Sequence, residues 1–260
     1  MNVDIFILAR SASNRLPKKH LRKIKGKPII ESLVDRMKKS KVVRKIVVCT
    51  TDLPSDDKLA EILEEKHIDC FRGDDKDIIK RLYDAAQLYK TDIIIDVSGD
   101  KIYTDVDYVD EVSEILLNND IDFVRGSSVE SQFDPGDHFI HGIIPGGFKT
   151  KILEKIFQLK KTNNTEDGYT EFFTTADWIK KKFLVPKIKL EETKNIKLDL
   201  DYPEDLKLAE KIFGKLDNNF HASDILKVFR QNPELAKINQ SNIDNWKKNY
   251  EKLRTDYSLK

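Results

Sequence analysis

The stretch DIIIDVSGDKIYTDVDYVDEVSEILLNNDIDFV, residues 92–124, decides the fold class. Its apolar run at 92–97 predicts a buried strand, its amphipathic pattern at 105–119 predicts a helix, and the run at 121–124 predicts a second strand. Two strands joined by a helix form the crossover unit of a parallel sheet. This stretch therefore indicates an α/β protein.

The same alternation continues toward the N-terminus. Strands are expected at 3–8, 44–50 and 68–71, and helices at 28–40, 55–66 and 75–90. Pro28 suits the first position of its helix, and Ser55 suits the N-cap of the next one. We expect a Rossmann-like, mainly parallel sheet that is covered by helices on both faces.

The second half of the chain is less regular. Segment 125–147 is rich in glycine and turn residues, which predicts an insertion or a β-arm. Further helices are expected at 150–160 and 166–181, strand-like segments at 183–190 and 195–201, and a helix from Pro203. The predicted organisation is an α/β domain over 1–214, with the arm or insertion at 126–147, and a helical C-terminal extension over 215–260.

The overall composition excludes several classes of protein. With 46 Lys and Arg against 45 Asp and Glu, the 260-residue chain has a net charge of +1 and gives no reason to expect a nucleic acid or membrane partner. No apolar run reaches the roughly 18 residues that span a bilayer, and Asp4 does not suit a signal peptide. Cys49 and Cys70 lack the spacing of metal ligands. We expect buried thiols and a cytoplasmic protein.

Positive charge is concentrated near the N-terminus. The loop that follows the first predicted strand contains no glycine, although glycine-rich turns usually bind nucleotide phosphates at this place. Arginine and lysine side chains can bind phosphate oxygens instead. The alternative is a solvent-exposed basic surface. Between Ile5 and Ile30 there is no acidic residue, and the basic residues are Arg10, Arg15, Lys18, Lys19, Arg22, Lys23, Lys25 and Lys27.

Other candidate site residues follow the remaining strands, because ligands of open parallel sheets bind beyond the carboxyl ends of the strands. Thr51, Gly73 and Ser98 stand at such positions. Gly99 lets a ligand approach closely, and Asp100 lies where a carboxylate and phosphate oxygens can share a Mg²⁺ ion. The alternative for Asp100 is a helix cap or a turn.

The segment KLDLDYPEDL, residues 197–206, brings a second group of carboxylates. Alternation with period two places Lys197, Asp199 and Asp201 on one side. Asp201 is a second candidate for binding a cation, although it stands just before a helix and is equally suited to cap it. Asp205, in the first helical turn, is expected to be structural. The pair Asp199-x-Asp201 also resembles the D-x-D motif of glycosyltransferases.

The motifs together resemble those of a known family. Three segments look like segments of that family: VVCTTD (47–52), FRGDDKDIIKRLYDAA (71–86) and LDYPEDL (200–206). The similarity covers residues 3–125 and 196–213. The chain resembles the CTP-dependent cytidylyltransferases of the spore-coat-polysaccharide, 3-deoxy-manno-octulosonate (Kdo) and CMP-sialic acid synthetase types. The family pattern A-R-x-x-S-x-R-L-P-x-K-x-L is met by Ala9, Arg10, Ser13, Arg15, Leu16, Pro17, Lys19 and Leu21.

The resemblance implies that CMP is transferred from CTP to a small acidic acceptor and that pyrophosphate is released. Arg10, Lys19 and Asp100 would be the catalytic residues, and Asp100 and Asp201 would hold Mg²⁺. Electrostatic stabilisation and positioning suffice for such a reaction. The residues implied to contact the nucleotide are Ala9, Arg10, Ser13, Arg15, Lys19, Thr51, Gly73, Arg81 and Ser98.

The sequence departs from the family at two places. Lys101–Ile102–Tyr103 follows Asp100 where a residue and Pro-Leu are usual, and Tyr202 replaces a common threonine. Segment 126–181 matches no acceptor pattern, so the acceptor stays open between an ulosonic or nonulosonic sugar acid and a phosphate or phosphonate compound. The residues considered for binding it are Lys149, Tyr169 and His141.

Two other functions remain open alongside the cytidylyltransferase. One is a non-catalytic nucleotide-binding module, and the other is a glycosyltransferase that uses the D-x-D motif. The resemblance places the enzyme in the biosynthesis of a surface polysaccharide or glycoconjugate, and it suggests a homodimer with segment 126–147 at the interface.

Overall fold

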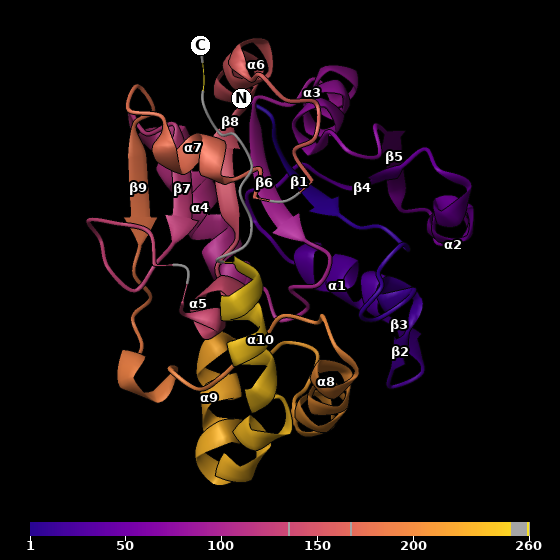
Figure 1. The fold of residues 1–260 in the computed structure, drawn as a ribbon, viewed down its shortest axis with the longest axis vertical. Coiled ribbons are helices and arrows are strands. Elements are labelled where there is room, and N and C mark those ends of the chain that lie inside the picture. Colours follow the sequence, from indigo (N-terminus) through magenta and orange to yellow (C-terminus); the bar gives the residue numbers. More distant parts are fainter. Residues whose placement is uncertain (135, 167, 251–258, 260) are drawn as a thin grey trace.

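The computed structural model describes residues 1–134, 136–166, 168–250 and 259. Seven of the described strands form one sheet in the order β5-β4-β1-β6-β8-β7-β9, in which β8 runs antiparallel to its neighbours (Figure 1). A separate hairpin consists of β2 (Lys23–Ile24) and β3 (Lys27–Pro28). The strands of the sheet are β1 (Val3–Leu8), β4 (Lys45–Thr51), β5 (Asp69–Gly73), β6 (Ile93–Ser98), β7 (Phe123–Gly126), β8 (Gly146–Lys149) and β9 (Lys181–Leu184).

Helices cover both faces of this sheet. Strand β1 shows the alternation that serves the two faces: Ile5 and Ile7 are buried in one apolar cluster, and Phe6 is buried in the other. The first cluster contains α1 (Ile29–Met37), α2 (Asp57–Glu65), α4 (Val106–Asn118) and α5 (His138–Ile143), and the second contains α3 (Ile78–Tyr89), α6 (Thr150–Leu159) and α7 (Glu171–Thr175). The predicted α/β fold class is confirmed.

The sheet order positions the predicted site. Strand β1 lies between β4 and β6 and pairs in parallel with both. The carboxyl ends of these three strands therefore lie at the same edge of the sheet, and their last residues are Leu8, Thr51 and Ser98. This is the edge at which ligands of open α/β sheets bind.

Segment 126–147 is not a β-arm. It contains α5, and its last residues begin β8, which lies inside the sheet between β6 and β7. A Cβ atom at Gly147 would lie 2.6 Å from Val112 and 2.8 Å from Leu116, both in α4. The glycines that suggested turns are thus used here for close packing of a strand against a helix.

Three other expected elements differ in the structure. The helix predicted at 166–181 is reduced to α7, and residues 195–201 form no regular strand. Ser55 is not an N-cap, because residues Pro54–Asp56 form a short 3-10 helix, η2, directly before α2. The remaining predicted strands and helices up to residue 124 are present, with ends shifted by a few residues.

The described part of the C-terminal extension contains short helices that follow α8 (Pro203–Lys215): α9 (Ala222–Gln231), the 3-10 helix η4 (Pro233–Ile238) and α10 (Gln240–Tyr250). Tyr103 is buried beneath it, with its ring 5.3 Å from that of Phe213 and 6.3 Å from that of Phe220. Tyr103, one of the residues that depart from the family pattern, thus packs against the C-terminal part of the chain. The proposed domain boundary at residue 214 stays a prediction.

The imidazole of His221 joins α9 to α4. Its Nδ1 atom lies 3.0 Å from a carboxylate oxygen of Asp105 and 3.2 Å from one of Asp107. Asp105 also accepts the backbone N–H groups of Asp107 and Ala222. Although these three side chains have the spacing of metal ligands, the cluster is accounted for by this junction between two helix N-termini.

None of the described helices is both long enough and apolar enough to span a membrane.

Candidate active site

The basic loop after β1 is shaped without glycine. The carboxylate of Asp56 accepts the backbone N–H of Ser11, and the N–H of Lys18 lies 3.2 Å from the carbonyl oxygen of Ser11. Lys18 adopts a left-handed backbone conformation with φ of 54°. These contacts turn the chain back, so that Lys19 starts a short 3-10 helix, η1 (Lys19–Leu21), and is buried.

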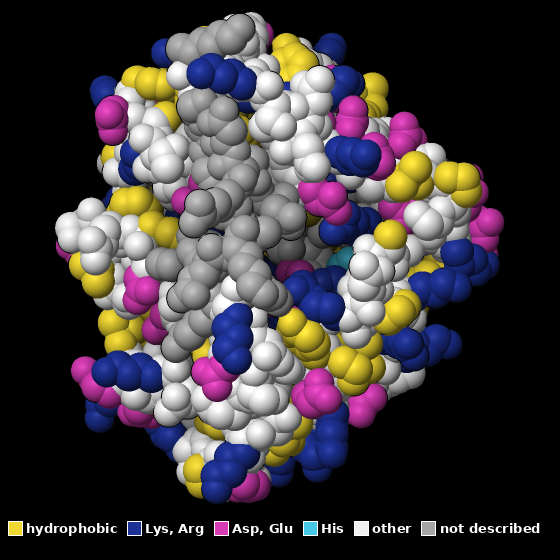
Figure 2. Space-filling model, viewed as in Figure 1, with side chains coloured by type: hydrophobic (Ala, Val, Ile, Leu, Met, Phe, Trp, Pro, Cys, Tyr) yellow, Lys and Arg dark blue, Asp and Glu magenta, His cyan; other side chains and the backbone are white. Residues whose placement is uncertain are grey.

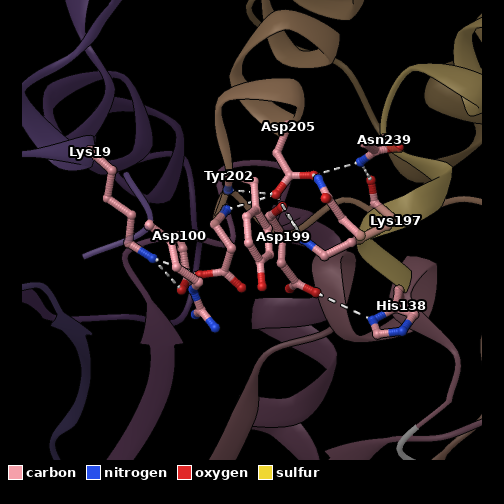
Figure 3. A network of polar contacts seen from close by, with 11 residues as sticks. Lys19, Asp100, His138, Lys197, Asp199, Tyr202, Asp205 and Asn239 are labelled. Atoms are coloured by element: carbon pink, nitrogen blue, oxygen red, sulfur yellow. Dashed lines mark hydrogen bonds and ion pairs between the residues drawn. The ribbon is translucent and has the colours of Figure 1, made fainter. Parts of the chain in front are cut away.

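Lys19 joins the two predicted cation-binding carboxylates. Its Nζ atom lies 2.8 Å from Asp100 Oδ2 and 3.1 Å from Asp201 Oδ1. Figure 3 shows the Lys19 side chain pointing toward Asp100. Arg15 Nη2 lies 3.0 Å from the same oxygen of Asp201, and the Arg15 guanidinium lies over the ring of Tyr202 at 5.2 Å. Three segments that are far apart in the sequence thus meet in one charged cluster.

The charges of this cluster support one another. Burial alone would raise the pKa of Asp100, but the charge and hydrogen bond of Lys19 and a hydrogen bond from Ser98 hold that pKa well below its usual range. Burial alone would lower the pKa of Lys19, but Asp100 and Asp201 raise it. The carboxylate of Asp100 and the ammonium of Lys19 are therefore both charged at neutral pH.

A cavity of about 640 Å³ opens beside the charged cluster. Its size is that of a small-molecule site, and Figure 2 shows basic side chains gathered around a hollow in this face. The predicted residues that line it are Ala9, Arg10, Ser13, Arg15, Lys19, Arg81, Ser98, Asp100 and Asp201. His20, Asn14 and Glu166 also line it.

Arg81 presents a buried cation to this cavity. Its side-chain atoms Nε and Nη1 have no hydrogen-bond partner among the described residues. Burial and the nearby charge of Arg10 lower its pKa. Since a buried charged donor without an acceptor is costly, this side chain favours an anionic ligand in the cavity.

Arg10 also lines the cavity and forms an ion pair with Glu166. Both side chains are partly exposed, so a phosphate group can compete with Glu166 for the guanidinium. Glu166 was not predicted as a site residue, because it comes from an irregular segment whose place in the fold no sequence period indicates.

Thr51 and Gly73 do not line this cavity, but Thr51 lines a smaller one of about 180 Å³ that shares Arg10 and Glu166 with it. The hydroxyl of Thr51 donates to the carboxylate of Asp56, the residue that also holds the basic loop. A Cβ atom at Gly73 would lie 2.7 Å from the ring of Phe71 and 3.2 Å from Cγ of Arg81. That these two residues contact the nucleotide stays a prediction.

His20 supports the turn that carries Asp100. A Cβ atom at Gly99 would lie 2.8 Å from the His20 ring, so the glycine is needed for this close approach. Burial and the charge of Lys19 lower the pKa of His20 to about 4. His20 is therefore neutral at neutral pH.

The candidates for acceptor binding are dispersed. Tyr169 lines the cavity and donates a hydrogen bond to the buried carboxylate of Asp96. His141 is buried and contacts the carbonyl oxygen of Asp134. Lys149 pairs with Ile93 at the start of β6, which is the far end of that strand from Ser98. The expectation for Lys149 is therefore wrong.

Asp96, which accepts a hydrogen bond from the cavity-lining Tyr169, was not predicted from the sequence as a residue of the site. Burial raises its pKa, and its Oδ1 atom has no hydrogen-bond partner among the described residues. A signal was present, because alternation with period two places Asp96 on the same face of its strand as Ser98.

The two carboxylates of the D-x-D segment, Asp199 and Asp201, have different side-chain contacts. The Asp199 carboxylate lies 3.7 Å from Nδ1 of His138 (Figure 3), and the His138 ring contacts that of Trp246 edge-on at 4.5 Å. Asp201 contacts Lys19 and Arg15. The two carboxylates thus have separate partners.

The donor set of the charged cluster fits a hard divalent cation. Oxygens of Asp100 and Asp201 both lie within hydrogen-bond distance of one ammonium nitrogen. Carboxylate oxygens that converge on one point are the ligands that Mg²⁺ uses alongside substrate phosphates. An ammonium and a magnesium ion would satisfy the same electrostatic need of these two carboxylates.

The protein is a member of the cytidylyltransferase family: the family model described as "Cytidylyltransferase" matches residues 5–223. This membership makes the chain a nucleotidyltransferase, as the motifs predicted. It sets aside the non-catalytic nucleotide-binding module.

Individual relatives agree with this assignment. The chain is 28% identical to the protein MJ1063 of Methanocaldococcus jannaschii, over 93% of this chain and 96% of that one. It is 23% identical to the spore coat polysaccharide biosynthesis protein SpsF of Bacillus subtilis, over 91% and 98%. It is also 30% identical to a 3-deoxy-manno-octulosonate cytidylyltransferase of Geobacter sulfurreducens, but only over 46% of this chain and 47% of that enzyme.

A solved structure shows the same architecture. The cytidylyltransferase of Leptospira borgpetersenii superposes with a TM-score of 0.80 at 26% identity, over 91% of this chain and 97% of that one. The fold described above is therefore that of a cytidylyltransferase over most of the chain.

Proposed function

We propose that the protein transfers CMP from CTP to a small acidic acceptor, in a Mg²⁺-dependent reaction that releases pyrophosphate. The observation that carries this proposal is the buried ammonium of Lys19 between the carboxylates of Asp100 and Asp201, beside a cavity lined by cations. A triphosphate and a divalent cation supply the opposite charges that these groups require.

The side chains suggest how the reaction is assisted. An acceptor oxygen attacks the α-phosphorus of CTP, the bond to the β-phosphate oxygen breaks, and pyrophosphate leaves. Arg10, Lys19 and Arg81 bind phosphate oxygens and stabilise the charge that develops on the leaving group. Asp100 and Asp201 would hold the metal, which neutralises phosphate charge when bound. Ser98 and His20 keep Asp100 in place.

A glycosyltransferase function is less well supported. The two aspartates of the D-x-D motif have different side-chain contacts, because Asp199 lies near His138 while Asp201 contacts Lys19. The cations around the cavity also suit a triphosphate better than the diphosphate of a nucleotide sugar.

The acceptor and the pathway belong to the same proposal. A ulosonic or nonulosonic sugar acid, or a phosphate or phosphonate compound, would enter beside Tyr169, and the product would serve the synthesis of a surface polysaccharide or glycoconjugate. The name of the Bacillus relative supports a role in polysaccharide synthesis, and the name of the Geobacter relative supports a sugar acid as acceptor. The free cysteines Cys49 and Cys70 suit a reducing compartment, and we propose the cytoplasm; a homodimer also stays a prediction.

Thermal unfolding tests the choice of nucleotide. The midpoint is measured with Mg²⁺ and CTP, UTP, GTP or ATP in turn, because a ligand that binds the native state raises the midpoint by mass action. We expect a clear rise with CTP alone, followed by pyrophosphate release when sugar acids and phosphonates are added. A protein that no triphosphate stabilises would contradict the proposal, and a rise with another nucleotide would change the assigned substrate.

A further inference from the structure

Asp205 is the centre of a buried polar network at the start of α8. Its Oδ2 atom accepts the backbone N–H groups of Asp201 and Tyr202, each at 2.9 Å. The same oxygen lies 3.0 Å from Nζ of Lys197. Figure 3 shows Lys197, Tyr202 and Asn239 around this carboxylate. The network therefore holds the backbone of Asp201, whose side chain lies in the charged cluster described above.

The other oxygen of Asp205 is held by the C-terminal extension. Asn239, between η4 and α10, donates from Nδ2 to Oδ1 at 2.8 Å and to the carbonyl oxygen of Lys197 at 3.0 Å. Asn242, in α10, donates to the same Oδ1 at 3.2 Å. Both asparagines are buried, with exposed fractions of 0% and 3%.

These contacts exceed what a helix start requires. A capping aspartate at this position normally accepts the N–H of the N-cap residue, which here is Tyr202. Asp205 binds in addition an ammonium, the N–H of Asp201 and two amides from a later part of the chain. The asparagines also lie beyond residue 223, where the match to the family model ends.

We propose that the C-terminal extension positions Asp201: its two asparagines hold the carboxylate that fixes the Asp201 backbone. The inference rests on the metal role proposed for Asp201. Asn239 and Asn242 touch no substrate and act as positioning residues. Asp205 is one step removed from the proposed metal ligand, and changes to such partners commonly alter metal affinity or activity 10- to 100-fold. The asparagines act through Asp205.

The test is the substitution Asn239→Leu, which removes both hydrogen bonds at similar volume. Its matched control is Asn245→Leu, the same change at an exposed position of α10. A second control, Leu63→Ala, destabilises the protein from α2, next to the far edge strand β5. Two quantities are measured: the Mg²⁺ concentration that gives half-maximal turnover, and hydrogen exchange of the Asp201 and Tyr202 amides in the ligand-free protein.

We expect Asn239→Leu to raise the half-maximal Mg²⁺ concentration about 10-fold and to accelerate exchange of the two amides by a similar factor. Neither control should change the Mg²⁺ requirement, even where Leu63→Ala lowers the melting temperature as much. If Asn239→Leu folds and both quantities equal those of the wild type, the proposal is wrong. If Asn239→Leu does not fold, the same two quantities are measured for Asn242→Ala, which removes only the 3.2 Å hydrogen bond to Asp205. We expect each quantity to change about 3-fold, and wild-type values would show that the proposal is wrong.

The exchange measurement separates this proposal from the proposed function. If the wild type shows no turnover of any nucleotide, the proposed function fails, while faster exchange in Asn239→Leu still shows that the extension holds the Asp201 backbone. If turnover is present and the Mg²⁺ requirement is unchanged despite faster exchange, the proposed function stands and the positioning role is overturned.

Discussion

The side-chain nitrogen of Lys19 lies 2.8 Å from a carboxylate oxygen of Asp100, at the carboxyl ends of neighbouring parallel strands. In the protein without ligand, the lysine thus occupies the place where a cation and a triphosphate are proposed to bind. Binding of CTP and Mg²⁺ should therefore be mutually dependent, because Lys19 can leave the carboxylate only when another cation replaces it and a phosphate accepts the ammonium.

Replacing Asp100 by asparagine should abolish metal-dependent turnover and leave the fold intact. Asparagine keeps the shape of the side chain but loses the charge that binds the cation. We expect kcat/KM to fall at least about 100-fold and the circular dichroism spectrum to stay unchanged. Asp177→Asn, an exposed position with the same chemical change, is the control. Wild-type turnover in Asp100→Asn would refute the metal site.

Lys19→Ala should weaken triphosphate binding and strengthen the effect of Mg²⁺ on the free protein. The variant leaves Asp100 and Asp201 without their ammonium, so a divalent cation gains two unpaired carboxylates. Calorimetric titration with CTP should show an affinity about 10-fold lower, and Mg²⁺ alone should raise the melting temperature more than in the wild type. Lys23→Ala, on the exposed hairpin, should behave like the wild type. An unchanged CTP affinity would instead identify the loop as a solvent-exposed basic surface.

Arg81→Met should separate stability from binding. The buried guanidinium has two nitrogens without partners among the described residues, so an apolar side chain of similar length removes a desolvation cost. We expect the free energy of unfolding to stay within about 1 kcal/mol of the wild-type value or to rise. The affinity for CTP should fall about 10- to 100-fold, the equivalent of one lost charged hydrogen bond. A large loss of stability with normal CTP affinity would show that Arg81 is structural, and Arg230→Met on the surface serves as the control.

His20 should make the protein less stable in acid. Its pKa is lowered from 6.5 to about 4 in the folded state, so between these values the unfolded chain binds a proton that the folded one does not. Stability then decreases as the pH falls from 6.5 toward 4, by about 3 kcal/mol from this residue. Denaturant unfolding at pH 7.0, 6.0 and 5.0 measures the slope. His20→Gln should reduce it, and an equal slope in both proteins would show that His20 titrates normally.

Much of the fold could be predicted from local pattern. The apolar run Ile93–Val97 and the amphipathic segment that follows it gave the correct element types, because a buried parallel strand and a covering helix each impose their own period on the sequence. The pattern failed at Gly147, where glycine signified close packing against Val112 instead of a turn. Composition alone does not distinguish these two uses of glycine.

The residue types of the candidate site were also predictable. Basic side chains in a loop after the first strand, and an aspartate after the fourth, follow from the rule that ligands bind at the carboxyl ends of parallel strands. The partners were not predictable. Thr51 stands at such a strand end, and its hydroxyl donates to Asp56, whereas Glu166, from an irregular segment, reaches Arg10.

By itself the sequence determined the class of sheet, the family and the chemical character of the site, because these depend on periodicity and on motifs that are local in the chain. Only the tertiary structure decided which charges meet. Lys19, Asp100 and Asp201 come together because β1 and β6 are neighbours and α8 starts beside them. The tertiary structure likewise places Asn239 of the extension on Asp205. Such contacts depend on the packing of elements far apart in the sequence, which no local pattern records.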